Sequence, residues 1–249
     1  MSNSPRDQHE SARNQYREVI VNEIDAAEGD IGYAIAIGSP SWEEFNRVGQ
    51  LEAALLVQYG LLGCETIVDV GCGSGRLAFS LPKLFRGNYI GTDISEPLLR
   101  RAAQSLKSPH FRFLLVDDLV IPVEDNSVNM VSMFSLLTHL RHEESFLYLR
   151  EAKRVMRSGS TLVFSFLDFS QESHWSIFEE TVEAVSSRSL HHVNQFMSRD
   201  LVVAWAKMLE FEVVDIHDGQ GKFIEYHNPD GAVSLESIGQ SVAVLRRSC

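Results

Sequence analysis

The chain has 249 residues, of which 44% are hydrophobic and 22% are charged, so it can bury one sizeable α/β core. Its 22 basic residues against 34 acidic ones give a net charge of −12, which disfavours phosphate backbones and anionic lipid headgroups as partners. The three cysteines form no CxxC pair, the N-terminus shows no apolar signal segment, and no apolar run reaches ~18 residues. We therefore expect a soluble, reduced, cytoplasmic protein that binds neither nucleic acid nor a membrane.

The first 60 residues are predicted to form a helical N-terminal cap. Apolar residues recur at near-helical spacing from Tyr16 to Ile24. A further helix starts near Ser41, which can cap the first turn while Glu44 bonds back to it. Gly60 is a plausible end for that helix.

From residue 61 onward, short β-branched apolar runs alternate with helical stretches, which predicts βαβ units and a mostly parallel sheet. The seven predicted strands are 66–70, 89–93, 111–116, 128–134, 161–166, 211–216 and 241–245, and the predicted helices are 77–85, 96–106, 143–156 and 199–209. The connection before the last strand contains turn residues and no clear helix, so we expect that strand to be antiparallel. Residues 168–197 interrupt the alternation and are predicted to form a lid insertion.

A glycine loop follows the first predicted strand, in the segment VDVGCGSGRLA at positions 68–78. Gly71, Gly73 and Gly75 allow positive φ angles and a close approach of the backbone to a ligand, and Cys72 lies among them. The amides that begin the next helix favour polar or anionic groups. Asp93 follows at the end of the second strand, where a carboxylate can accept hydrogen bonds from ribose hydroxyls. Together these residues indicate a cofactor that contains adenosine.

Two further carboxylates bear on which cofactor this is. The loop also fits GxGxxA, which is typical of dinucleotide binding, so an NAD-dependent oxidoreductase is an alternative. Asp69 would repel a pyrophosphate, whereas it would attract the ammonium group of a methionine moiety. Asp117, or its neighbour Asp118, can accept a hydrogen bond from an adenine amino group at the end of the third strand. Phe134 ends the fourth strand at the same edge of the sheet.

These motifs together resemble class I S-adenosylmethionine-dependent methyltransferases, over about residues 60–246. DVGCGSG (69–75) resembles their first motif, YIGTDIS (89–95) their second, and RVMRSGSTLV (154–163) the helix end, turn and fifth strand of the family. Asp117 lies five residues before Pro122, as the family's adenine-side acid does. Ser158, Ser160 and Glu210 depart from the usual residues at their positions.

The resemblance implies a three-layer, Rossmann-like sandwich with seven strands, spanning residues 61–249, that binds S-adenosylmethionine. Asp93 would be the ribose-binding acid, and Ser95 the more natural cap of the following helix. Asp69 would contact the methionine moiety, or else bind the amides of the glycine loop. Ile94 and Leu119 could sandwich the adenine, although ordinary core packing explains them about as well.

The methyl acceptor is expected to be a small molecule that binds between the N-terminal cap and the 168–197 lid. O-methylation is the first expectation, with N- or S-methylation as alternatives, and the segment after Phe134 lacks the Asn-Pro-Pro-Tyr pattern of many amino-group methyltransferases. His139 is a candidate general base. Three other histidines and five aromatic residues could line the acceptor site: His174, His191 and His192, and Tyr16, Tyr33, Trp42, Trp175 and Phe196. No metal site is expected. A non-catalytic S-adenosylmethionine-binding protein is a second alternative.

Overall fold

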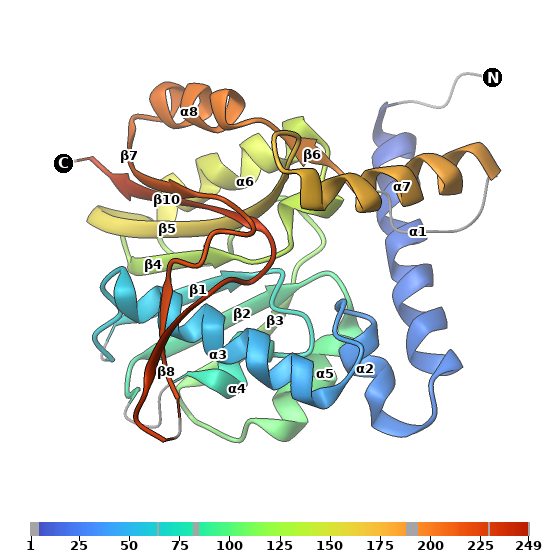
Figure 1. Ribbon diagram of the computed structural model, residues 1–249, viewed down its shortest axis with the longest axis horizontal. Helices are drawn as coiled ribbons and strands as arrows, with labels where there is room; N and C mark the ends of the chain where they lie inside the picture. Colours follow the sequence, from blue (N-terminus) through green and yellow to red (C-terminus); the bar gives the residue numbers. More distant parts are fainter. Residues whose placement is uncertain (1–4, 64, 82–84, 188–193, 229, 249) are drawn as a thin grey trace.

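The computed structural model describes residues 5–63, 65–81, 85–187, 194–228 and 230–248. Figure 1 shows a central sheet with helices on both faces and a helical arm, α1, to one side. The strands are β1 Thr66–Val70, β2 Asn88–Asp93, β3 Phe111–Leu115, β4 Val128–Met133, β5 Met156–Asp168, β6 Phe196–Met197, β7 Phe211–His217, β8 Ile224–His227, β9 Val233–Glu236 and β10 Ser241–Arg247. The α-helices are α1 Pro5–Ala26, α2 Gly32–Ile35, α3 Trp42–Gln58, α4 Arg76–Ser80, α5 Glu96–Ser105, α6 His142–Val155, α7 Trp175–Ser187 and α8 Arg199–Met208. Short 3₁₀ helices cover η1 Gly29–Ile31, η2 Leu137–His139 and η3 Glu172–His174.

The main sheet has the strand order β3-β2-β1-β4-β5-β10-β7, and β6 adds to β5 beside this path. The strands from β3 to β5 run parallel, whereas β10 is antiparallel to both β5 and β7. This arrangement confirms the predicted α/β fold with an antiparallel last strand. Because the parallel strands end at one edge, Asp69, Asp93 and the segment after β4 are brought together there.

Two apolar cores cover the two faces of this sheet. One core packs α6 and α8 against the sheet through residues such as Leu149 and Trp205. The other packs α3 and α4 through Leu55 and Leu77. The helix α3 therefore covers the sheet, although it lies within the segment predicted as a cap, and α1 is the long helix that stands away from the sheet (Figure 1). The close contact of α3 with α4 needs a glycine, since a Cβ at Gly49 would lie 2.5 Å from the Arg76 carbonyl oxygen.

Several local predictions differ from the structure. The helix predicted at 77–85 is the single short helix α4, which ends at Ser80. The turn expected around 157–160 is a bulge inside β5, because β5 begins directly after α6 and its pairing with β4 shifts between Val128 and Met130. Ser41 caps α3 as predicted by accepting from the Glu44 amide at 3.1 Å, but the Glu44 side chain bonds Arg47 instead of reaching back.

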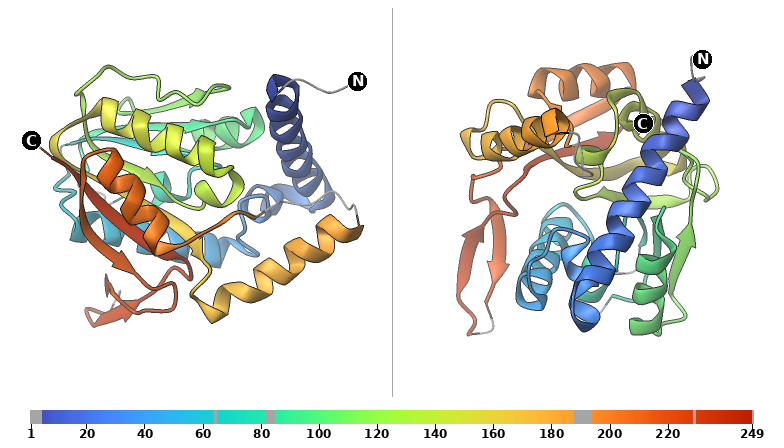
Figure 2. Two further views of the ribbon diagram at one scale, coloured as in Figure 1. Left: turned by 90° about the horizontal axis from the view of Figure 1, so that it is seen from above. Right: turned by 90° about the vertical axis from the view of Figure 1, so that its right-hand side faces the viewer.

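The segment 168–197 contains η3, α7 and the short strand β6, whose Phe196 pairs with Leu167 of β5. Figures 1 and 2 show α7 extending from the sheet on the side where α1 stands. The connection before β10 folds into the β8–β9 hairpin, which contacts α3. No helix in the described ranges is long and apolar enough to cross a membrane.

Candidate cofactor and acceptor site

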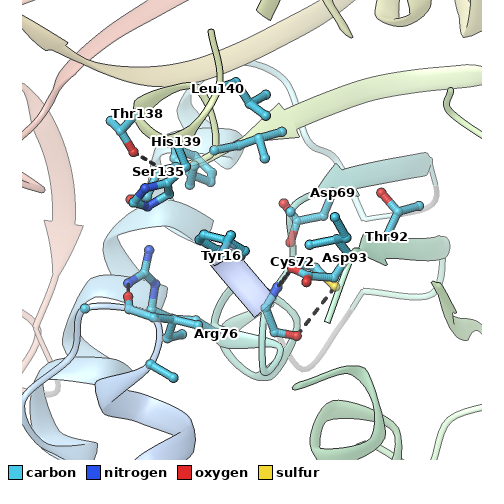
Figure 3. Close-up of a pocket in the computed structure, with 18 of the residues that line it drawn as sticks. Tyr16, Asp69, Cys72, Arg76, Thr92, Asp93, Ser135, Thr138, His139 and Leu140 are labelled. Carbon is cyan, nitrogen blue, oxygen red and sulfur yellow. Dashed lines mark hydrogen bonds between the residues drawn. The ribbon is translucent and has the colours of Figure 1, made fainter. Parts of the chain in front are cut away.

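A cavity of about 510 Å³ opens at the edge of the sheet where the parallel strands end. This volume lies within the usual range for small-molecule sites. Its floor comes from the ends of β1, β2 and β4, and its walls from α1, α3, α6 and α7. Figure 3 shows Asp69, Cys72 and Asp93 on one side of the cavity, with Ser135, Thr138 and His139 on the other.

The glycine loop wraps around the end of β2. The amides of Gly71 and Cys72 both donate to the Thr92 carbonyl oxygen, at 2.8 and 3.0 Å. Gly71, Cys72 and Gly73 line the cavity as predicted, but Gly75 does not. Gly75 caps α4 with φ +92°, and a Cβ there would lie 3.1 Å from the Cβ of Ala102. Gly75 therefore serves the turn and the packing of α4 against α5.

Asp69 is a buried carboxylate held by two hydroxyl groups from neighbouring strands. Tyr89 donates to one carboxylate oxygen at 2.6 Å and Ser132 donates to the other at 2.8 Å. Burial raises the pKa of Asp69 from 3.8 to about 7, although the hydrogen bonds from Tyr89 and Ser132 lower it. The alternative that Asp69 binds the amides of the glycine loop is wrong. Asp69 lines the cavity from the strand, where it can face a cationic group.

Asp93 is the carboxylate that binds the glycine loop. Its two oxygens accept from the Gly73 amide at 2.9 Å and from the Ser95 amide at 2.8 Å. Ser95 occupies the N-cap position of α5 without a side-chain cap bond, so the cap expected of Ser95 is not formed, and Asp93 accepts from the Ser95 amide instead. Burial raises the pKa of Asp93 against the opposing effect of these backbone bonds. Asp93 also lines the cavity, and a carboxylate oxygen can accept more than one hydrogen bond, so ribose binding by Asp93 stays a prediction.

The predicted adenine side of the cavity lies next to α1. Asp117 and Asp118 both line it, as do the three apolar residues predicted there, Ile94, Leu119 and Phe134. The Asp117 carboxylate forms an ion pair with Arg17, and the Asp117 carbonyl oxygen accepts from Arg13. The helix α1 is thus attached to the segment that follows β3.

The acceptor side of the cavity is built from α1, η2 and α6. His139 lies in η2 with its ring 5.4 Å from that of Tyr16, centroid to centroid. Burial raises the pKa of Tyr148, on α6, to about 12, and it raises the pKa of Tyr16 as well. Both phenols therefore remain protonated at neutral pH.

Most of the other residues predicted to surround the acceptor pack elsewhere. Of the five aromatic residues, Tyr16 lines the cavity. Tyr33 and Trp42 lie under the Arg101 guanidinium, and Trp175 and Phe196 belong to an aromatic cluster around Phe178. The rings of these four residues are therefore used in packing, which is the alternative role open to each of them.

The prediction for His174 is wrong. Its ring is 1% exposed, with Nδ1 accepting from the Asp168 amide at 2.8 Å and Nε2 donating to the Gly239 carbonyl oxygen at 3.1 Å. It joins the end of β5 to the segment before β10. His191 and His192 lie outside the described residues. Within the described ranges, no three potential ligands are grouped as a metal site would need.

A buried ion pair at the cavity wall was not predicted. Arg76 of α4 pairs with Glu52 of α3 at 2.5 Å, and Glu52 is 1% exposed. Burial raises the pKa of Glu52, although Arg76 lowers it. The two residues are 24 positions apart on different helices, so the sequence pattern holds no local signal for their contact.

Comparisons with known proteins agree with this geometry. Residues 67–159 match the family described as "Methyltransferase domain". The fold of the chain is that of the class I S-adenosylmethionine-dependent methyltransferases. S-adenosylmethionine is the cofactor of such a domain, and the comparisons do not favour the NAD alternative.

Curated relatives of this methyltransferase domain are distant. An uncharacterized methyltransferase of Schizosaccharomyces pombe is 30% identical over 105 residues, which are 38% of this chain and 37% of that protein. A ubiquinone biosynthesis O-methyltransferase of Hydrogenovibrio crunogenus is 25% identical over 143 residues, which are 53% of this chain and 58% of that protein. The chain therefore spans less than two thirds of either relative.

Solved structures show the same fold over almost the whole chain. A possible histamine N-methyltransferase of Thermotoga maritima has a TM-score of 0.62 at 16% identity, and the match covers 96% of this chain and all of that one. A magnesium protoporphyrin IX methyltransferase of Synechocystis, solved with bound S-adenosylmethionine, has a TM-score of 0.61 at 16% identity, covering 99% of this chain and all of that one.

Proposed function

We propose that this protein transfers a methyl group from S-adenosylmethionine to a small-molecule acceptor, with a hydroxyl oxygen as the first candidate for the methylated atom. The observation that carries the proposal is the single cavity in which the methyltransferase motifs and the residues of α1, η2 and α7 meet. A donor and an acceptor bound side by side in that space would react in the geometry that lowers the barrier most.

The residues present fit the cofactor. Gly71, Cys72 and Gly73 of the glycine loop line the cavity. Asp69 can face the ammonium group, Asp93 the ribose hydroxyls, and Asp117 or Asp118 the adenine. When bound, the cofactor would supply a methyl group attached to a positively charged sulfur: the acceptor atom would form a bond to the methyl carbon, and the sulfur would keep the electron pair of the bond that breaks. The protein's own groups hold the acceptor, keep out water and take its proton, and His139 is the proposed base.

We further propose that residues 1–60 and 168–197 enclose the acceptor. Tyr16 and Glu23 of α1, together with Ile177 and Glu180 of α7, line the outer part of the cavity. The net charge of −12 supports the same class of acceptor, because it disfavours nucleic acid and anionic membrane surfaces.

The test combines binding with turnover. Calorimetry with S-adenosylhomocysteine and with NAD in parallel should show binding of the former alone, and Asp93→Ala should remove most of that affinity. Transfer of radiolabelled methyl groups from S-adenosylmethionine to an extract of small metabolites then separates an enzyme from an accessory protein. Binding of NAD in place of S-adenosylhomocysteine would refute the proposal. Cofactor binding without any labelled product would favour a non-catalytic role.

A further inference from the structure

Three polar side chains form a closed hydrogen-bonded ring beside the acceptor half of the cavity. The Ser135 amide donates to the Ser165 hydroxyl oxygen at 2.8 Å, and that hydroxyl donates to Gln240 Oε1 at 2.7 Å. Gln240 Nε2 then donates to the Ser135 hydroxyl oxygen at 3.2 Å, which closes the ring. The ring joins the ends of β4 and β5 to the start of β10. None of its members has a place in cofactor binding as described above.

The ring holds Ser135 in a conformation that serine rarely adopts. Its φ is +56°, in the left-handed region, where a side chain costs free energy unless its surroundings impose it. The partner that imposes it is Ser165, which is fully buried on β5. Ser135 and His139 both line the cavity, and Figure 3 draws them on the same side of it. Strained serines kept by a dedicated buried partner are typical of positions with a function.

Two hydrogen-bond donors of the ring residues are not used within the ring. The Ser135 hydroxyl accepts from Gln240, so its own hydrogen can be donated, and no group in the described part of the chain accepts it. Gln240 has two hydrogens on Nε2 and uses one of them within the ring. Both side chains line the cavity. An oxygen atom of a ligand would satisfy both donors at once.

The charge of the surrounding wall restricts the kind of oxygen. Among the described residues, nine acidic side chains line the cavity against two arginines, Arg13 and Arg76. A carboxylate on the acceptor would be repelled by these acids, whereas an uncharged hydroxyl would not. The donors would favour its deprotonated form at the moment of transfer, and the proton would pass to His139 on the same wall.

We propose that Ser135 and Gln240 bind the acceptor's hydroxyl oxygen, and that Ser165 acts as a positioning residue for both. The acceptor would be an uncharged molecule with a weakly acidic hydroxyl group, such as a phenol. This inference rests on the proposed methyltransferase function and specifies the acceptor atom.

The experiment compares phenol, aniline and benzenethiol as methyl acceptors, with radiolabelled S-adenosylmethionine as the donor. These three probes differ only in the oxygen, nitrogen or sulfur group attached to the benzene ring. The variants are Ser135→Ala, Ser135→Gly, which suits φ +56°, and Gln240→Glu, which can still accept from Ser165 but cannot donate. Ser160→Ala is the matched control, because Ser160 is a buried serine of β5 that donates to the Val128 carbonyl oxygen at 3.0 Å, away from the cavity. Affinity for S-adenosylhomocysteine is measured for every variant.

We expect phenol to be the preferred probe, and each ring variant to lower kcat/KM for phenol about tenfold or more, the worth of one good hydrogen bond. Affinity for S-adenosylhomocysteine should change less than about twofold, and the control variant should retain activity. Preference for aniline or benzenethiol, unchanged kcat/KM in the ring variants, or no transfer to any probe by a protein that binds S-adenosylhomocysteine would overturn the inference. Failure to bind S-adenosylhomocysteine at all would overturn the proposed function instead.

Discussion

The raised pKa of Asp69 predicts that cofactor binding is coupled to loss of a proton. Burial shifts this pKa from 3.8 to about 7, so roughly half of the free protein carries a protonated Asp69 at neutral pH. A shift of about three pKa units corresponds to about 4 kcal/mol between the two protonation states. A ligand ammonium group beside the carboxylate would return some of this energy by favouring the charged form.

The raised pKa of Asp69 should affect protein stability and cofactor affinity in opposite directions as the pH rises. Because the folded-state pKa is raised, the contribution of Asp69 to the stability of the free protein is fully present below its unfolded pKa of 3.8 and is lost as the pH rises through about 7. Affinity for S-adenosylhomocysteine should rise about fivefold from pH 6 to pH 7 and less than about twofold from pH 7 to pH 8. At pH 7 about half a proton should be released per ligand bound.

Calorimetry in phosphate and Tris, which differ in ionisation enthalpy, measures the released protons directly. Asp69→Asn removes this titrating group and should weaken the change of affinity between pH 6 and pH 8. Tyr89→Phe removes a hydrogen bond that favours the charged carboxylate, so the affinity should level off at a higher pH. Affinity of the natural sequence that stays constant from pH 6 to pH 8, or an unchanged pH dependence in Asp69→Asn, would refute the reasoning.

Three further predictions concern the cavity walls. Arg76→Met should cost about 3–5 kcal/mol in urea unfolding at pH 8, because it leaves Glu52 buried without its counter-charge. The cost should be smaller at pH 5, because burial raises the pKa of Glu52 and a lower pH favours its neutral form. An equal loss at both pH values would contradict this, and Arg76→Met with Glu52→Leu should recover most of the stability. Gly75→Ala should cost about 1–3 kcal/mol. It should exceed the cost of Gly159→Ala in thermal unfolding, since no atom lies within 4 Å of a Cβ at Gly159. Arg17→Ala should change global stability by less than about 1 kcal/mol, because the Arg17–Asp117 ion pair is largely exposed. It should nevertheless speed amide hydrogen exchange in α1. Unchanged exchange would show that this ion pair does not hold α1 in place.

Most of the sheet could be predicted from the sequence, because β-branched runs ending in glycine or aspartate carry strong local signals. The strand 66–70 and the antiparallel last strand are examples. Less could be predicted where tertiary contacts decide the structure. The position of α3 on the sheet depends on the close approach at Gly49, and the bulge in β5 depends on its pairing with β4.

The candidate site divides in the same way. The loop residues and carboxylates at strand ends were predictable, since topology places strand ends together. The acceptor side was not, because its residues come from separate elements and similar side chains serve packing elsewhere. His174 and Tyr16 illustrate this contrast, since one is a buried structural link and the other lines the cavity. The ring of Ser135, Ser165 and Gln240 could be found in the structure alone, because it joins three strands.

The place of β10 bears on how this protein reaches its fold during synthesis. This strand, the last of the sheet to be translated, lies between β5 and β7 and pairs with both along nearly its whole length. Until this strand has joined the sheet, β5 presents an open edge of apolar residues, and such edges readily pair with other chains. We therefore expect the nascent chain to depend on chaperones late in translation, and Gln240 to reach the cavity at the moment the sheet closes.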